Sequence, residues 1–325
     1  MRIALFLPHV GVFGGVRRYL ELGNEWVDMG HDVTLHHPDG AAPAWLPFAG
    51  RTATLAAAGA SASDLALSGD AVTYPAFRAH DSRRHLYYCV IEGDPGLPAA
   101  IADTNVTLMA NSGPLRRQLA RRVRREVLDG AGGIRVERFH PEPARRAGTP
   151  LRVLVNGRRS RAKKGTDLVL RALSRLAGRV PAFETVLFDA LDPRTNRQDP
   201  RDGAPLPPNA RFVLDPTQDE LVALYQSSHV FVAAERKAGW CNTALEALAS
   251  GCALVCTTSG TTDFARHGEN ALVCWRNRWS LRAAIARLLI DAALRERLAA
   301  AGPASAAPWA WNTLARRILA QVDAA

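Results

Sequence analysis

The chain has 325 residues, 47% of them hydrophobic, and carries a formal net charge of +10 at pH 7. The length exceeds that of one ordinary α/β domain and favours two, and the composition excludes a disordered chain. The excess of Lys and Arg suits an anionic partner, but these residues are spread over several segments without a zinc-finger, RNA-binding or helix-turn-helix pattern. We therefore rank nucleic acid last among partners and expect none.

The cysteines and the apolar runs indicate the compartment. Five cysteines is an odd number, most of them lie in apolar stretches, and no pair has C-x-x-C spacing, so we expect reduced core thiols, as in cytosolic proteins. The first residues resemble a strand and not a signal peptide, and no apolar run reaches the length of a membrane span. We expect a cytoplasmic protein and leave open a peripheral contact at the inner face of a membrane.

The N-terminal half opens with a strand, a glycine-rich turn, a helix and a second strand. Residues 3–7 form an apolar run, which predicts a parallel strand buried on both faces. A turn with three glycines follows at 11–15, and apolar residues then recur at helical spacing until Gly30, which is typical of the position after a helix. With a strand at 31–36, this segment is the first unit of a doubly wound sheet.

The rest of this half is predicted in less detail. Strands are expected at 86–91 and 106–110, and Ser112 is a candidate N-cap for a basic helix over 115–127. Residues 130–143 are rich in turn formers and have no periodicity. They are the predicted linker.

A second series of strands and helices begins after the linker. The predicted strands cover residues 151–155, 185–188, 211–214, 229–234, 253–256 and 271–274. The predicted helices cover 166–176, a segment from the capping box of Thr217 and Glu220 to Tyr225, 243–249 closed by Gly251, and finally 314–322. This alternation predicts an α/β fold of two Rossmann-like domains facing a cleft, with ligands beyond the carboxyl ends of the strands.

Three segments carry candidate binding groups, and the first is the turn with Gly14 and Gly15. Glycines allow a ligand to approach the backbone, and the helix N-terminus behind them favours a phosphate. The spacing does not fit G-x-G-x-x-G, so a dinucleotide site is weakly supported. The alternative is a tight turn without a ligand.

The second segment is the basic turn at residues 157–165. Five cations, among them Arg158 and Lys164, repel one another there, so we expect an anion such as a pyrophosphate to offset them. Those two side chains would also stabilise charge that grows on a departing diphosphate. The alternative is a solvated surface run.

The third segment covers residues 235–252. A strand is predicted to end there, a loop with Gly239 turns, and a helix opens with Thr243 near its start and Glu246 in its first turn. Amides at 240–243 would point at a phosphate or sugar, and Glu246 would accept from ribose hydroxyls. Alternatively, Glu246 only complements the helix dipole.

Together these motifs resemble family 4 of the retaining glycosyltransferases, which have the GT-B fold. The likeness rests on the glycine pair after the first strand and on four later motifs, which are Gly157-Arg158, Lys164-Gly165, Gly239-Trp240 followed by Glu246-Ala-Leu-Ala-Ser-Gly-Cys252, and His267-Gly-Glu-Asn270-Ala-Leu-Val. It is strong over residues 151–275 and looser over 40–85.

The resemblance implies roles for particular residues. Arg158 and Lys164 would hold the donor pyrophosphate, and Glu246 would hold the ribose. The donor would also contact Gly14, Gly15, Val213, Leu214, Gly239, Trp240, Cys241, Asn242 and Thr243, with Val213–Asp215 at the base and the last two residues giving amides to the phosphates. His9 and Glu92 are cleft candidates for which an ordinary structural role is expected.

One position departs from the family. The usual first carboxylate lies eight residues before the second, which here is Ala238, and Glu235 is too early to replace it unless the loop shifts. The identity of the sugar and, to a smaller degree, catalysis itself are therefore open.

The resulting prediction is a metal-independent retaining glycosyltransferase that uses a UDP- or GDP-sugar and no cofactor. Residues 1–145 would form the acceptor-side domain, 150–307 the donor domain, and the helix in 308–325 would pack back on the first. The acceptor would be a glycan, a lipid or a small natural product. The alternatives are an inactive sugar-nucleotide or partner-binding protein and a nucleotide-sugar epimerase.

Overall fold

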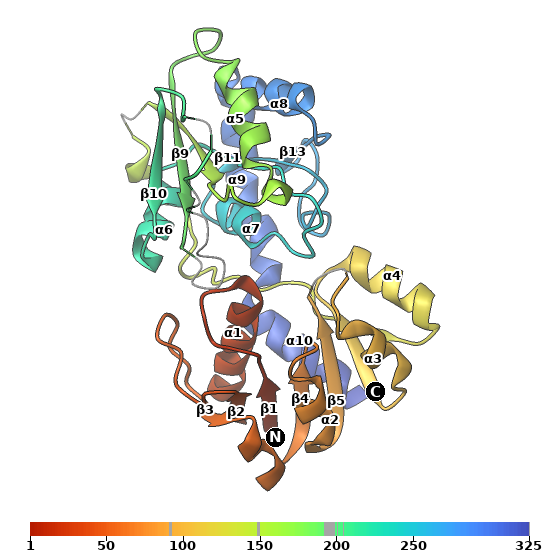
Figure 1. The fold of residues 1–325 in the computed structure, drawn as a ribbon. Helices are drawn as coiled ribbons and strands as arrows, with labels where there is room; N and C mark the ends of the chain where they lie inside the picture. The colour runs from red at the N-terminus through yellow and green to blue at the C-terminus, as the bar shows by residue number, and fades with distance from the viewer. Residues whose placement is uncertain (91–92, 148–149, 192–198, 200, 204, 325) are drawn as a thin grey trace. The chain divides into compact units, whose positions relative to one another are not determined.

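The computed structural model describes residues 1–90, 93–147, 150–191, 199, 201–203 and 205–324. They form two compact units, the first made of Met1–Gly133 with Trp309–Ala325 and the second of Ile134–Pro308 (Figure 1). The chain passes from the first unit to the second inside the predicted linker, and it returns to the first unit just before the last helix. Each unit is a parallel α/β sheet with helices, so the predicted fold class is confirmed.

The sheet of the first unit has the strand order β3-β2-β1-β4-β5-β6-β7, and its pairings are parallel. Its elements are β1 (Arg2–Phe6), α1 (Gly14–Asp28), β2 (Asp32–His37), β3 (Arg51–Thr54), β4 (Ala62–Ser68), α2 (Tyr74–Ala79), β5 (Asp81–Cys89), α3 (Leu97–Ala102), β6 (Val106–Ala110), α4 (Gly113–Val123), β7 (Val127–Asp129) and α10 (Trp311–Ala324).

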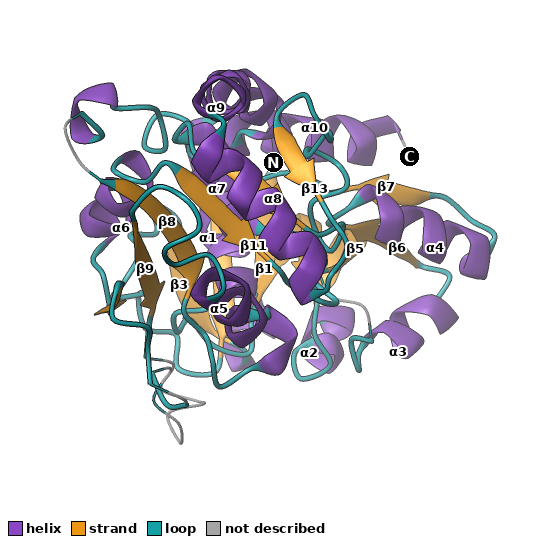
Figure 2. Ribbon diagram, turned by 90° about the horizontal axis from the view of Figure 1, so that it is seen from above, coloured by secondary structure: helices purple, strands orange, loops and turns teal. Residues whose placement is uncertain are grey.

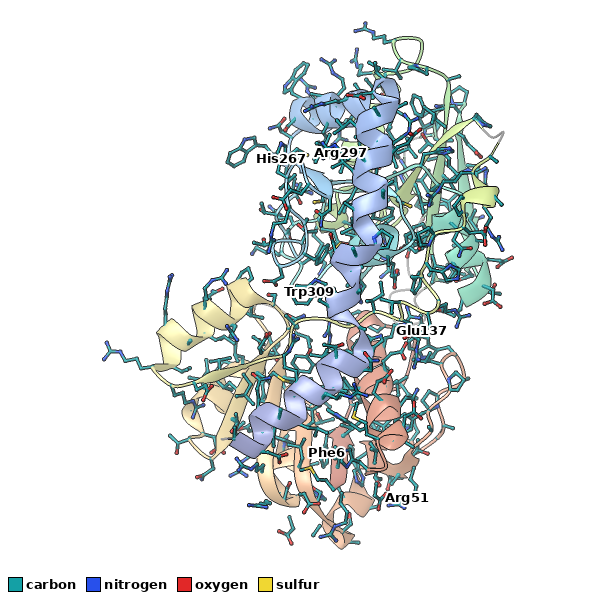
Figure 3. The ribbon with its side chains drawn as sticks, turned by 180° about the vertical axis from the view of Figure 1, so that it is seen from behind. Phe6, Arg51, Glu137, His267, Arg297 and Trp309 are labelled. Carbon is teal, nitrogen blue, oxygen red and sulfur yellow. The ribbon has the colours of Figure 1, made fainter. Side chains whose placement is uncertain are left out.

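The last helix, α10, belongs to the core of the first unit. It packs against α1, and the Trp26 indole of α1 donates to the carbonyl of Ala315 at 3.2 Å. The Arg18 guanidinium lies 5.4 Å from the Trp311 ring, and a side chain on Gly133 would collide with that ring. In Figure 3, α10 begins just beyond Trp309 and crosses the first unit.

The sheet of the second unit has the order β10-β9-β8-β11-β12-β13, again with parallel pairings. Its elements are β8 (Leu151–Asn156), α5 (Thr166–Ser174), β9 (Phe183–Asp189), β10 (Ala210–Leu214), α6 (Gln218–Gln226), β11 (Val230–Ala233), α7 (Asn242–Ala249), β12 (Ala253–Cys256), β13 (Ala271–Val273), α8 (Arg278–Ile290) and α9 (Ala292–Ala306). Helices α5 and α8 pack together, as do α7 and α9 (Figure 2).

The structure corrects the sequence predictions at several points. The helix predicted to reach residue 127 ends at Val123, because Arg124 adopts a left-handed conformation with φ of 53°, and Val127 begins a strand. Strands β3 and β4 and helices α2, α3, α8 and α9 were not predicted. The caps at Ser112 and Thr217 and the left-handed Gly30 are confirmed.

Candidate functional site

The candidate site of the second unit lies at the carboxyl edge of its sheet. The basic turn follows β8, Asp189 ends β9, Leu214 ends β10 and Glu235 follows β11. Because neighbouring strands in this sheet are parallel, these ends lie on one edge, where ligands of such sheets bind. Val213 and Leu214 are the last residues of β10 and pair with Phe188 and Asp189.

Arg158 forms a two-pronged ion pair with Asp189. Its Nε and Nη2 atoms each donate to one carboxylate oxygen at 2.8 Å, and the Asp189 side chain is only 6% exposed. The backbone N–H of Asp215 donates to the carbonyl of Asp189 at 2.9 Å, which joins the end of β10 to this pair. The planar fork fixes the orientation of the guanidinium.

Lys164 is held by Glu235. Its Nζ donates to Oε1 of Glu235 at 2.9 Å, and the two side chains are 25% and 11% exposed. The Arg236 N–H also donates to the Lys163 carbonyl at 2.7 Å, so the basic turn is fastened to the loop after β11. Gly165 makes this approach possible, because it has φ of 77° and a side chain there would collide with the Ala234 carbonyl.

Carboxylates of the chain itself therefore offset much of the charge of the basic turn. Arg158 pairs with Asp189, Lys164 with Glu235, and Arg159 with Asp167 at 2.9 Å. The anionic groups expected beside this turn include carboxylates of the chain itself, which the sequence did not identify, and the expected pyrophosphate stays a prediction. A diphosphate would meet cations that are already oriented.

The loop before α7 holds the third candidate segment. The Cys241 N–H donates to the Gly260 carbonyl at 2.9 Å, and Trp240 packs edge-on against Phe264 with ring centroids 5.2 Å apart. Gly239 precedes them, while Asn242 and Thr243 open α7, where first-turn amides have no acceptor within the helix. The Ala238 N–H donates to Oγ of Ser259 at 2.8 Å.

Glu246 lies in the second turn of α7, and the prediction that it occupies the first turn is wrong. The residue is 7% exposed, and its Oε2 accepts a hydrogen bond of 2.9 Å from the Tyr225 hydroxyl. Burial raises the pKa of Tyr225 well above its usual value, and the charge of Glu246 raises it further. Tyr225 therefore remains a phenol that donates to the carboxylate.

Sequence reasoning did not assign Tyr225 a role, although it marked the residue as the end of a helix. The only feature of the sequence that could have pointed to Tyr225 is its place in the last turn of the capped helix α6. The contact with Glu246 depends on how α6 packs, which the sequence does not state.

Cys241 connects the two halves of this site. Its thiol lies 3.7 Å from Oε1 of Glu235. Burial, followed by the charge of Glu235, raises the pKa of Cys241 itself, so the thiol stays protonated. Lys164 is thus linked through Glu235 to Cys241, the residue directly before α7, and α7 carries Glu246.

The remaining candidates belong to the first unit. Gly14 and Gly15 are the first residues of α1, whose N-cap Phe13 gives no side-chain hydrogen bond, and a side chain on Gly15 would make an ordinary contact with Phe13. Nδ1 of His9 accepts from the Gly11 N–H at 3.1 Å, a structural contact. Glu92 lies outside the described residues.

A protein-family model matches most of the second unit. The family model described as glycosyl transferases group 1 matches residues 137–305. The chain belongs to this family. Enzymes of the group 1 glycosyltransferases transfer sugars from nucleotide-sugar donors.

Solved structures resemble this glycosyltransferase in fold over its whole length. It resembles HepE from Anabaena, solved with UDP and glucose, at 14% identity and a TM-score of 0.78, with 100% of each chain covered. Sucrose-phosphate synthase from Thermosynechococcus elongatus has 17% identity and a TM-score of 0.76, covering 99% of this chain and 98% of that one. The glycosyltransferase therefore has the GT-B fold. A search among curated proteins found no match.

Within the ranges given above, no three His, Cys, Asp or Glu residues gather as ligands for a metal ion. All five cysteines are free thiols. Over the same ranges, no helix combines the length and apolarity that a bilayer span requires.

Proposed function

We propose that this chain is a family 4 glycosyltransferase that retains the anomeric configuration of its sugar and requires no metal ion. Residues 150–307 would bind a UDP- or GDP-sugar, and residues 1–145, completed by the helix in 308–325, would bind the hydroxyl acceptor. The enzyme would work in the cytoplasm, with a peripheral contact at the membrane.

One observation carries the proposal: two oriented cations lie at the carboxyl edge of a sheet, and a buried carboxylate lies on the helix that follows one of its strands. Arg158 and Lys164 are fixed by Asp189 and Glu235 at 2.8 and 2.9 Å. Glu246 is buried on α7, the helix that follows β11, and keeps a carboxylate oxygen beside the Tyr225 hydroxyl. Such an arrangement suits a nucleoside diphosphate, with cations for the phosphates and a carboxylate for ribose hydroxyls.

In the proposed reaction, the bond between the anomeric carbon and the donor phosphate oxygen breaks as the acceptor hydroxyl oxygen forms its bond on the same face. The acceptor proton passes to the departing diphosphate, whose growing charge is stabilised by Arg158 and Lys164. Two cations at this place supply the stabilisation that a divalent metal gives in other enzymes.

The remaining candidate residues would bind the donor without taking part in bond breaking. Asn242 and Thr243 would offer backbone amides to the phosphates at the N-terminus of α7. Gly239, Trp240 and Cys241 would line the donor, Val213 and Leu214 would border the base, and Gly14 and Gly15 would contact the donor from the first unit. The structure of HepE with UDP-glucose supports a uridine nucleotide as the first donor to test.

The test combines calorimetry with product analysis. A panel of nucleotide sugars, screened by thermal stabilisation, identifies the donor, and NMR of the product reports the anomeric configuration with and without a chelator. Glu246→Ala should weaken nucleotide binding about tenfold or more, since a buried acceptor of ribose hydroxyls is lost. Unchanged nucleotide affinity would remove the ribose assignment, and an inverted product would remove the retaining mechanism.

A protein that binds a sugar nucleotide without transferring it is the second candidate. Ala238 favours it, because the family usually has a carboxylate there and the methyl group cannot bind sugar hydroxyls. Donor binding without hydrolysis, and without transfer to any acceptor, would support this alternative. Conversion of the donor sugar in the absence of an acceptor would instead indicate an epimerase.

A further inference from the structure

The turn between β13 and α8 exposes two tryptophans. The side chains of Trp275 and Trp279 are 81% and 58% exposed, although tryptophan is among the residues that gain most from burial. A single exposed apolar side chain is ordinary, but two large indoles within five residues form a patch that favours a partner.

The turn that carries these indoles is held by hydrogen bonds. The side-chain oxygen of Asn277 accepts from the N–H groups of Trp279 and Ser280 at 3.0 and 2.8 Å. Oγ of Ser280 accepts from the Trp275 N–H at 3.1 Å, and the Asn277 N–H donates to the Trp275 carbonyl at 2.8 Å. The two indoles are thus presented by an ordered cap at the start of α8, which lowers the entropy lost on binding.

Arginines surround the exposed indoles. The guanidinium carbons of Arg278 and Arg282 lie 4.5 and 5.2 Å from the centre of the Trp279 ring. The sequence from residue 275 to 290 contains no Asp or Glu. The surface of this turn therefore combines aromatic rings with several positive charges.

A basic cavity of about 460 Å³ adjoins the turn, between the starts of α5 and α8. It is lined by Arg159, Arg161, Arg171, Arg276 and Arg278, while Asp167 is paired with Arg159 at 2.9 Å. Burial and the neighbouring charge of Arg236 lower the pKa of Arg276, as expected where positive charges crowd together. An anion in or beside this cavity would relieve that repulsion.

A second cavity of about 730 Å³ also adjoins the turn. Trp275, Leu272 and Val273 line it together with the charged side chains of Glu235, Arg236, Lys237 and Arg287, and Arg276 lines both cavities. The turn therefore combines apolar side chains with many arginines. This is the combination found in segments that lie at a membrane–water interface.

We propose that the Trp-Arg turn, defined as residues 275–279 with Arg282, docks the protein on a bilayer that contains anionic phospholipids. The indoles enter the headgroup layer, and the arginines bind lipid phosphates. A protein partner suits this surface less well, because arginines outnumber the acidic residues Asp167 and Glu235 around the two cavities and match a dense layer of phosphates better than a mixed protein surface. Arg158, Lys164 and Glu246 line neither cavity, although Glu235, which holds Lys164, lines the larger one.

The test measures partition onto vesicles by flotation, without donor or acceptor. The wild-type protein should bind vesicles of phosphatidylcholine mixed with phosphatidylglycerol and should not bind vesicles of phosphatidylcholine alone. The double variant Trp275→Ala/Trp279→Ala and the double variant Arg278→Glu/Arg282→Glu should each lower the partition coefficient roughly tenfold or more. The charge reversal should also reduce the dependence of binding on salt.

Matched controls replace other exposed apolar side chains. Val72→Ala, in the first unit, and Ile290→Ala, at the far end of α8, change side chains that are 70% and 62% exposed and should leave partition unchanged. Circular dichroism and thermal unfolding of every variant separate misfolding from lost docking. Because this assay needs no sugar nucleotide, its result is independent of whether the proposed reaction occurs.

Four outcomes would overturn the proposal. The first is equal binding to both vesicle types, and the second is wild-type binding by the double tryptophan variant. The third is complete competition by millimolar inorganic phosphate, which would identify a site for small soluble anions. The fourth is a wild-type protein that binds neither vesicle type. This result would refute lipid docking and would leave a protein partner as the occupant of this surface.

Discussion

At the scale of single residues, the site depends on carboxylates that hold other functional groups in position. Glu235 holds Lys164 at 2.9 Å, and Asp189 holds Arg158 through two hydrogen bonds of 2.8 Å. The two carboxylates act by fixing the direction from which a cation meets an incoming diphosphate.

This arrangement predicts the effect of Lys164→Ala. Loss of a cation that stabilises the departing diphosphate should lower kcat about a hundredfold. The same change leaves the Glu235 carboxylate without its cation at 11% exposure, so some stability is lost as well. Steady-state kinetics and urea unfolding measure the two effects separately.

Two further variants test the origin of that loss. Adding Glu235→Gln to Lys164→Ala removes the uncompensated charge and should restore stability while activity stays low. Lys163→Ala changes the exposed neighbour and should leave kcat within about twofold of the wild type. Recovery of activity in the double variant would mean that Lys164 is structural.

Tyr225→Phe tests the support of Glu246. The change leaves a buried carboxylate oxygen without its donor, so we expect a loss of about 1–3 kcal/mol in the free energy of unfolding and weaker nucleotide binding. Tyr74→Phe is the matched control, because the buried Tyr74 hydroxyl has no hydrogen-bond partner among the described residues. Equal destabilisation by both changes would show that the bond to Glu246 contributes nothing specific.

At the scale of elements, the sequence predicted best the segments whose pattern is local. The buried strands of the second unit lie within two residues of their predicted bounds, because an apolar run of four to six residues is visible without its neighbours. The capping box at Thr217 is likewise confirmed. Strand β3, with the sequence Arg-Thr-Ala-Thr, carries no apolar pattern, since it is an edge strand and partly exposed.

The ion pairs of the site could not be predicted in this way. Lys164 and Glu235 are 71 residues apart, and Arg158 and Asp189 are 31 apart. Their meeting depends on the order β9-β8-β11, in which β8 lies between the next strand of the chain and β11, which comes two strands later still. The sequence indicated which strand ends bear charge, but the choice of partners required the sheet.

Gly165→Ala tests the junction between two elements, the basic turn and the end of β11. Alanine would have to adopt φ of 77° and would collide with the Ala234 carbonyl, so we expect a loss of about 3 kcal/mol in the free energy of unfolding. Gly178→Ala, at φ of 73° with open space around it, isolates the backbone cost and should lose about 1 kcal/mol. Similar losses for the two variants would show that the collision is relieved by a small shift.

At the scale of the whole molecule, the chain leaves the first unit after Gly133, builds the second, and returns at Trp309. The first unit therefore cannot complete its fold before the segment that begins at Trp309 has been synthesised. Trp311 closes its core at 4% exposure, packed over Gly133 and beside Arg18. A residue near the C-terminus thus stabilises a sheet whose strands all lie before residue 130.

Trp311→Ala should therefore destabilise the first unit by about 3–5 kcal/mol, since a large buried ring is replaced by a cavity. Hydrogen exchange read by mass spectrometry should show lost protection in β1 and β4, while β8 and β11 keep theirs, because Trp311 belongs to the core of the first unit alone. Trp279→Ala, which changes a ring that is 58% exposed, should leave both sheets protected. Equal loss of protection in β1 and β8 would mean that the two units unfold as one, and the return of the chain at Trp309 would then stabilise the whole molecule.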